Sequence, residues 1–169
     1  MGITSYTCDY CGGYYGEVAK KETSGKTTAH HIPANSAINN GLGFIENKKN
    51  GDTPAILMDY ADHALTQSYQ HNNDKYGKVQ AELIRNGEIA KAIKMDYDDI
   101  LNIQVQQRLG EKYNKGLHQA ISHLYNLLSD SKEDLLQNHG DICNDVFLKS
   151  YDNPESIELV KKLLKSLEG

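Results

Sequence analysis

An apolar stripe at helical spacing in residues 111–128 limits the folds open to this chain more than any other feature of the sequence. The stripe consists of Tyr113, Leu117, Ala120, Ile121, Leu124 and Leu128. Residues three and four apart share one face of an α-helix, so this helix presents a wide apolar face. Such a face has to be buried against other elements, and the sequence therefore predicts a core helix.

Similar patterns predict further helices before and after this one. Asp59 and Asn153 have acceptor side chains of the kind preferred at N-caps, and Pro154 suits the first helical position. Asn86-Gly87 is a typical helix stop. The expected helices cover 59 to about 69, 76–86, a short stretch that starts at 89, about 96–109, and 154–167.

Residues 1–58 have a different character. They are rich in Gly, Asn, Thr and Tyr and show no sustained helical periodicity, which favours short strands and loops. At 169 residues the chain fits one domain. The expected fold class is therefore α+β and predominantly helical, with the chemistry at the junction of the two parts.

The composition limits the classes of function. No apolar run approaches the roughly 18–20 residues that a membrane span needs. The N-terminus also lacks the basic and then apolar layout of a secretory signal. The formal net charge of -5 argues against nucleic acid, because phosphate contacts use Lys and Arg. A few cations gathered on one face, together with a bound divalent metal ion, would reconcile this charge with a nuclease.

Two adjacent histidines, His30 and His31, precede an isoleucine and Pro33. Proline resists helix formation, so we expect the pair in an extended segment, where neighbouring side chains point to opposite sides. One imidazole can then bind a metal ion while the other faces a substrate, if a turn or twist brings both into one cleft. Metal-assisted phosphodiester hydrolysis needs this pairing of a neutral histidine base with a cation. His63, near the start of the helix expected at 59, is the best placed second ligand.

Two stretches carry a family resemblance, Ala29–Pro33 with its adjacent histidines and Pro54–Thr66 with its Asp-His pair. They resemble the nuclease domains of bacterial polymorphic toxins in the HNH/endonuclease VII (His-Me finger) superfamily, in particular the AHH-type members. The similarity extends over roughly residues 27–125. It implies one nuclease domain over 1–169, with a candidate zinc knuckle in 1–26, a ββα metal finger in 27–71 and a helical portion in 72–169.

This resemblance assigns roles to the histidines. His30 is implied as a catalytic residue and metal ligand, His31 as the general base, and His63 as the second ligand of the catalytic cation. Magnesium, or a transition metal such as manganese, nickel or zinc, would complete the site. The family's asparagine before the finger helix is missing from Thr53-Pro54-Ala55, and Gln67 stands where relatives carry a further histidine.

Several groups are alternatives for that missing ligand. Thr66, Gln67, His71 or a water molecule can take the position. The exact ligand set, and which histidine is the base, therefore stay open at this point.

The three cysteines predict a metal or free thiols rather than a disulfide framework. Cys8 and Cys11 have the spacing of a zinc knuckle. His139 and Cys143, four apart, would face the same way on a helical turn and complete a structural zinc site. The alternative is reduced cysteines, with Cys143 as a buried apolar residue.

Four lysines are candidate substrate contacts, because they flank the expected metal finger and can bind phosphates. They are Lys48, Lys49, Lys75 and Lys78. Solvated surface positions are the alternative for all four. His118 and His123 lie on or beside the apolar stripe, where a packing or surface role is expected.

The resemblance also implies the biology. By this resemblance the chain is expected to be an endonuclease that cuts nucleic acid, with DNA favoured. Its expected role is that of an antibacterial toxin domain in interbacterial competition. Such a domain is secreted within a larger polypeptide, acts in the target-cell cytoplasm, contacts no membrane and has a cognate immunity protein. The alternatives are a ribonuclease toxin and a non-catalytic, zinc-stabilised binding module.

Overall fold

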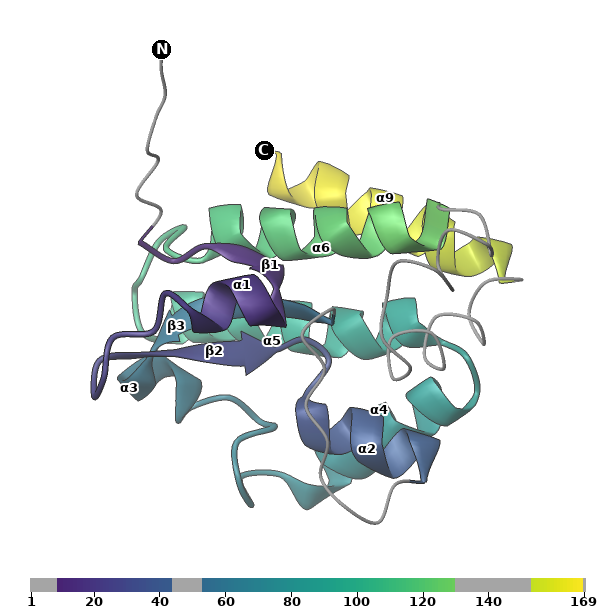
Figure 1. Ribbon diagram of the computed structural model, residues 1–169, viewed down its shortest axis with the longest axis horizontal. Helices are drawn as coiled ribbons and strands as arrows, with labels where there is room; N and C mark the ends of the chain where they lie inside the picture. Colours follow the sequence, from purple (N-terminus) through teal and green to yellow (C-terminus); the bar gives the residue numbers. More distant parts are fainter. Residues whose placement is uncertain (1–8, 44–52, 130–152, 169) are drawn as a thin grey trace.

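The structure is a computed structural model, and it describes residues 9–43, 53–129 and 153–168 (Figure 1). The fold is α+β and predominantly helical, as the sequence predicts. In chain order the elements are β1 (Gly12–Tyr14), α1 (Tyr15–Ala19), β2 (Thr27–His31), α2 (Asn35–Leu42), β3 (Pro54–Asp59), α3 (Tyr60–His63), α4 (Asp74–Arg85), α5 (Ile89–Gln106), α6 (Asn114–Ser129) and α9 (Pro154–Leu167).

The strands form one antiparallel sheet of three strands in the order β1-β3-β2. The segment before residue 27 is part of this sheet, since Gly12 pairs with Ile56 of the central strand. On the other side His30 pairs with Ile56 and His31 with Ala55. The histidine pair therefore lies at the end of β2, a strand paired on one side only.

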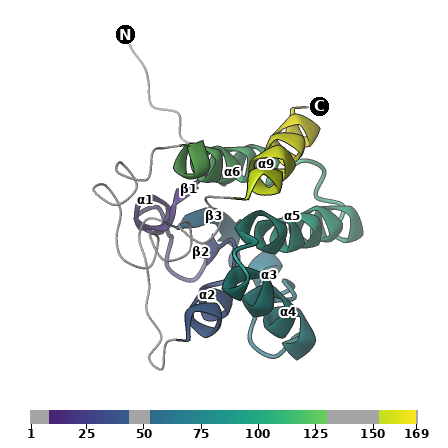
Figure 2. The same ribbon diagram turned by 90° about the vertical axis from the view of Figure 1, so that its right-hand side faces the viewer.

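Helices cover both faces of the sheet, because the central strand β3 is apolar on both (Figure 1). Ile56 and Met58 join the main core with the apolar stripe of α6. Ala55 and Leu57 pack on the opposite face with Val18 of α1. This alternation follows from the period of two along a strand. A 90° turn of the molecule shows α9 lying across α6, and α2 with α4 at the far end (Figure 2).

A pair of glycines allows α6 to cross closely over β1. A Cβ atom on Gly12 would lie 1.8 Å from the carbonyl oxygen of Gly116, and one on Gly116 would lie 2.2 Å from that of Tyr10. Both distances are far below contact distance. This crossing positions the β1 end of the sheet against the core helix.

The helices predicted at 76–86, 111–128 and 154–167 are confirmed, and the others are corrected. The Asn153 side chain accepts a hydrogen bond from the Glu155 backbone at 3.1 Å, so α9 begins as predicted. The short helix at 89 and the helix at 96–109 are one continuous helix, α5, because Asp96 is buried inside it rather than capping a new start. The helices α1 and α2 were not expected, since both are short and α2 is rich in Asn.

The helix expected from 59 to 69 ends at His63. Side chains that follow it bind its last carbonyl groups. The Thr66 hydroxyl donates to the carbonyl of His63 at 2.8 Å, and the Asn72 amide donates to the carbonyl of Ala64 at 2.9 Å. Such local side-chain bonds replace the helical ladder. The residues after His63 therefore form a fixed loop rather than further helical turns.

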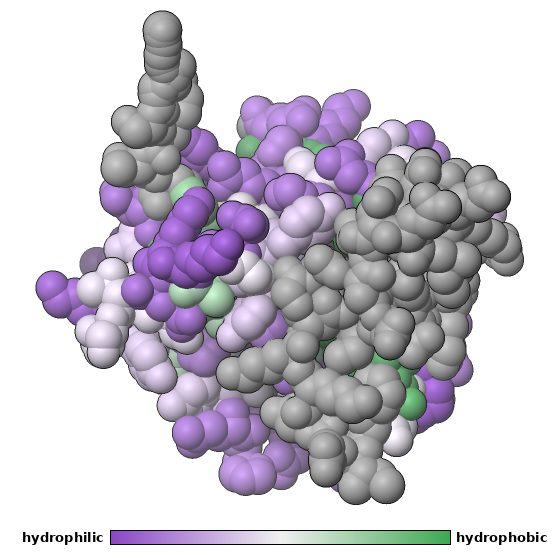
Figure 3. Space-filling view, viewed as in Figure 1, coloured by the Kyte–Doolittle hydropathy of each residue, from purple (hydrophilic) through white to green (hydrophobic). Residues whose placement is uncertain are grey.

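The described surface in the view of Figure 3 is mostly hydrophilic, with small and scattered hydrophobic areas. Within the described ranges, no helix combines the length and the apolar character that crossing a membrane requires.

Candidate active site

Three histidines, His30, His31 and His63, line one cavity of about 200 Å³ at the end of β2. The remaining wall comes from the start of α2 and from the loop after α3, which includes Tyr69. His30 and His31 are only 4% and 7% exposed. The sequence thus brings together the two adjacent histidines and a third one more than thirty positions away.

The strand pairing sets the direction of each imidazole. Directly opposed residues of an antiparallel pair share a face, so His30 shares the face of Ile56 and His31 that of Ala55. The His31 ring stacks on Tyr15 of α1 with 3.8 Å between centroids and 15° between planes. The expected opposite orientation of the two neighbours is present, and both still line the same cavity.

His63 reaches His30 because α3 follows β3 without a break. The His30 and His63 ring centroids are 5.0 Å apart, with 72° between the planes. Tyr69 packs edge-on against His63 at 5.1 Å. The Nε2 atom of His30 and the Nδ1 atom of His63 are buried without a hydrogen-bond partner in the part of the chain that is described. Buried polar atoms normally have partners, so these two nitrogens are open to a hydrogen bond from water or to a ligand.

Burial keeps this pair of imidazoles neutral. It lowers the pKa of His30 well below its ordinary value, and the proximity of His63 and His31 lowers it further. Burial also lowers the pKa of His63, and the nearby carboxylate of Glu22 opposes this in part. A neutral imidazole has a free lone pair, which metal coordination and proton abstraction both need.

A charged network anchors the short helix α3. The Lys112 ammonium donates to Asp59 Oδ2 at 2.5 Å and to Asp62 Oδ2 at 2.9 Å, and the buried Tyr113 hydroxyl also donates to Asp62. Burial lowers the pKa of Lys112, but these two hydrogen bonds outweigh it and leave the pKa raised. Asp62 is thereby held away from metal binding, and its position fixes the neighbouring His63.

Two carboxylates of α5 hold the other walls of the cavity. Asp99 accepts a hydrogen bond from the backbone N–H of Gln67 at 2.8 Å, which fixes the loop after α3. Buried Asp96 accepts from the Tyr76 hydroxyl at 2.6 Å and from the backbone of Ala34, the residue before α2. Ala34 itself lines the histidine cavity. The helix α5 therefore sets the shape of a site to which it contributes no wall.

The donors present fit a divalent cation only in part. His30 and His63 together offer two imidazole nitrogens, which suit transition metals and tolerate water or phosphate oxygen in the other positions. Within the described ranges there is no cluster of three or more His, Cys, Asp and Glu residues able to hold a metal ion.

The three side chains considered for a further ligand all have other partners. Thr66 donates to the His63 carbonyl, Gln67 binds Asp99, and His71 lies 3.3 Å from Asp74. A cation here would thus depend on water or substrate for its remaining positions.

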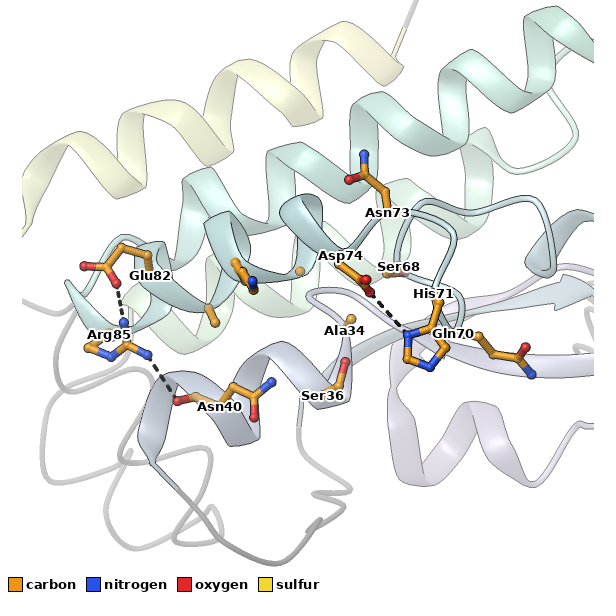
Figure 4. A pocket seen from close by; sticks show the side chains of 13 residues that line it. Ala34, Ser36, Asn40, Ser68, Gln70, His71, Asn73, Asp74, Glu82 and Arg85 are labelled. Carbon is orange, nitrogen blue, oxygen red and sulfur yellow. Dashed lines mark hydrogen bonds and ion pairs between the residues drawn. The ribbon is translucent and has the colours of Figure 1, made fainter.

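A second cavity, of about 580 Å³, lies beside the first between α2 and α4 (Figure 4). The two cavities share four lining residues: Ala34, Ser36, Ser68 and Gln70. Of the predicted substrate lysines, Lys78 lines this larger cavity, whereas Lys75 lines neither. Lys48 and Lys49 lie outside the described residues.

The predicted zinc site stays a prediction. Cys8, His139 and Cys143 lie outside the described residues. Cys11 is buried and disulfide-bonded, which corrects the expectation of a metal or a free thiol at this position; Cys11 can bind zinc only after reduction. The expected packing and surface roles of the α6 histidines agree with the structure: His123 packs on Tyr14 at 4.1 Å, and His118 contacts Glu168 at 3.2 Å.

Sequence reasoning did not find several residues of the site. Tyr15 and Tyr69 contact the histidines, and Ser36 and Gln70 connect the two cavities. Tyrosines are numerous in this chain, and no local pattern distinguishes these two. Comparison with protein-family models, with curated proteins and with solved structures finds no significant match.

Proposed function

We propose that the protein is a metal-dependent endonuclease that hydrolyses phosphodiester bonds. The main support is the approach of His30 to His63, with a centroid distance of 5.0 Å and two buried nitrogens that lack partners within the described residues. His31 lines the same small cavity. The strands β2 and β3, with α2 between them, precede the short helix α3, and a ββα metal finger needs two strands followed by a helix.

In this proposal His30 and His63 would hold a divalent cation with their imidazole nitrogens. The cation, when bound, supplies positive charge that stabilises the phosphate and the departing oxygen. His31 takes a proton from the attacking water, and the stacked Tyr15 ring limits rotation of its imidazole. Magnesium, manganese, nickel and zinc are the candidate cations.

A metal-free ribonuclease is the second candidate. It is favoured by the lack of a third metal-binding side chain in the described site. Here a histidine would deprotonate the ribose 2′-hydroxyl, and a second histidine would protonate the departing oxygen. A chelator abolishes the first activity and leaves the second intact.

The biological setting follows only from the resemblance of the sequence. The proposed role is that of an antibacterial toxin domain, carried on a larger secreted polypeptide and active on nucleic acid, DNA in the first place, inside a target cell. The proposed protein partner is a cognate immunity protein.

The test is cleavage of plasmid DNA and of RNA by the purified chain, with magnesium, with manganese and with excess chelator. We expect His31→Ala to lower turnover by about a hundredfold to ten-thousandfold, which is the usual contribution of a general base. His30→Ala and His63→Ala should in addition raise the metal concentration that gives half-maximal activity. His118→Ala, on the surface of α6, is the matched control and should keep full activity. Equal activity of His31→Ala and His118→Ala, with both folded, rules the proposal out.

A further inference from the structure

The larger cavity between α2 and α4 has the size and the position of a substrate site (Figure 4). Its volume of about 580 Å³ lies in the range of roughly 300–1,000 Å³ that is common for ligand sites. The larger cavity shares Ser36, Ser68 and Gln70 with the histidine cavity. A bound ligand can therefore extend from one cavity into the other while it stays in contact with the protein. The inference that the ligand of this cavity is also the substrate rests on the proposed hydrolysis at the histidines.

The larger cavity, called the groove from here on, has a lining that is polar and nearly neutral. Arg85 forms an ion pair with Glu82 and also donates to the carbonyl of Asn40 at 3.4 Å. His71 lies against Asp74, as Figure 4 shows. Lys78 takes part in none of the ion pairs between described residues. The two cations of the lining, Lys78 and Arg85, thus balance its two carboxylates, Asp74 and Glu82, and Lys78 is the cation that carries no ion pair within the described residues.

Amide and hydroxyl groups make up much of the remaining lining. Ser36 and Asn40 come from α2, and Ser68, Gln70 and Asn73 come from the loop before α4. Such groups pair with the edges of bases and with sugars, and a side-chain amide can donate and accept at once. A single lysine suits one phosphate rather than a run of them.

We propose that this groove binds the unpaired nucleotide next to the cleaved bond of a single-stranded nucleic acid, with Lys78 on its phosphate. A concave site takes a base that is free to leave the stack, whereas duplex DNA is read by convex elements that enter its grooves. Tight binding to a duplex backbone would also need many more cations. The inference agrees with the formal net charge of -5, since little of the recognition depends on phosphate.

Gly77 gives a steric test of this groove. It lies inside α4 and lines the cavity, and a Cβ atom added there would meet no atom within 4 Å. A larger side chain therefore fits the fold and fills the groove. Replacing a glycine in a helix interior also favours the helix, because glycine loses more conformational freedom on folding than other residues.

The experiment measures the binding of fluorescein-labelled hexanucleotides to the full chain by fluorescence anisotropy. The probes are single-stranded DNA, single-stranded RNA and the DNA duplex of the same sequence, each with magnesium and with chelator. The variants are Gly77→Leu, with Gly77→Ala as the matched control, and Lys78→Gln, with Lys75→Gln as its control on the same helix. Ser36→Phe blocks the groove from α2 and replaces Gly77→Leu if that variant fails to fold.

We expect Gly77→Leu to weaken single-strand binding by about tenfold or more, and Gly77→Ala to have little effect. The slope of log affinity against log salt should be shallow, and Lys78→Gln should reduce it by about 0.7, the value for one phosphate contact on a single strand. Lys75→Gln should leave the slope unchanged.

Equal binding by folded Gly77→Leu and Gly77→Ala overturns the inference. So does tighter binding of the duplex than of the single strands. A wild-type chain that binds no probe, with magnesium or with chelator, overturns it as well. These outcomes leave the hydrolysis assay of the histidine cavity unaffected. If Gly77→Leu weakens binding but the wild-type chain cleaves no nucleic acid, the groove is supported as a binding site and the proposed hydrolysis is ruled out.

Discussion

The buried carboxylate of Asp96 makes the stability of the protein depend on pH in a specific way. Burial raises its pKa to about 7, although its hydrogen bonds from Tyr76 and Gln80 act in the opposite direction. Asp96→Asn keeps the shape of the side chain and removes its titration. Comparison of the two proteins over a range of pH therefore isolates this one group.

The size of the effect follows from the two pKa values of Asp96. The ordinary value, which applies to the unfolded chain, is 3.8, and the folded value is about 7. Because the folded pKa is the higher one, the stabilisation is fully present below the unfolded pKa and is lost as pH rises through the folded pKa. At about 1.4 kcal/mol per unit the full loss is about 4 kcal/mol, of which about 3 kcal/mol falls between pH 5 and 8.

Urea unfolding followed by circular dichroism at pH 5, 6, 7 and 8 measures this loss. The wild-type curve alone is ambiguous, because His30 and His63 have lowered pKa values and make the protein more stable as pH rises. The difference between the two proteins removes these shared contributions. We expect Asp96→Asn to gain about 3 kcal/mol relative to the wild type from pH 5 to pH 8, which is a shift of about 1–3 M in the urea midpoint.

A constant difference between the two proteins over this range would refute the reasoning. It would mean that Asp96 titrates near its ordinary value and that its carboxylate reaches water. The absolute difference at any single pH is not the test, since the asparagine amide also changes the hydrogen bonds with Gln80. Only the slope against pH reports the titration.

Two further predictions concern the framework around the site. Tyr113→Phe removes the hydroxyl that donates to Asp62, and we expect a loss of about 1–3 kcal/mol and a melting temperature lower by about 2–10 °C in calorimetry; an unchanged melting temperature would contradict the network. Gly116→Ala places a Cβ atom 2.2 Å from the carbonyl oxygen of Tyr10, so we expect a large loss of folded protein by circular dichroism. Gly77→Ala, which has open space, is the control, and similar melting of the two variants would show that the close crossing is wrong.

The helical part of the fold could be predicted because its signals are local. The stripe of α6 and the N-cap of α9 each lie within one stretch of sequence. The predicted helix boundaries are wrong where a polar residue is buried and binds a partner from another helix. The sequence predicts a helix start at Asp96, yet this carboxylate accepts a hydrogen bond from Tyr76 of another helix, twenty positions away.

The candidate site was predictable only as far as its histidines. His30 and His31 are conspicuous side by side, and an Asp-His pair after an apolar run drew attention to His63. The contact of Tyr15 with His31 depends on α1 packing over the sheet, which no periodicity of a five-residue helix could reveal. The groove beside the site depends on α2 and α4 lying together, a long-range arrangement of the same kind.

The pairing of β2 with β3 also determines which of the two adjacent histidines takes which of the proposed roles. His30 and His31 differ only in the face of the sheet that each occupies, and a shift of one residue in the register would exchange them. His31 would then face His63, and His30 would face Tyr15. The two side chains are chemically identical, so only their odd or even position along the five residues of β2 decides which neighbours each one contacts. A single-residue insertion in β2 before His30 would move each histidine to the opposite face of the sheet without removing either one.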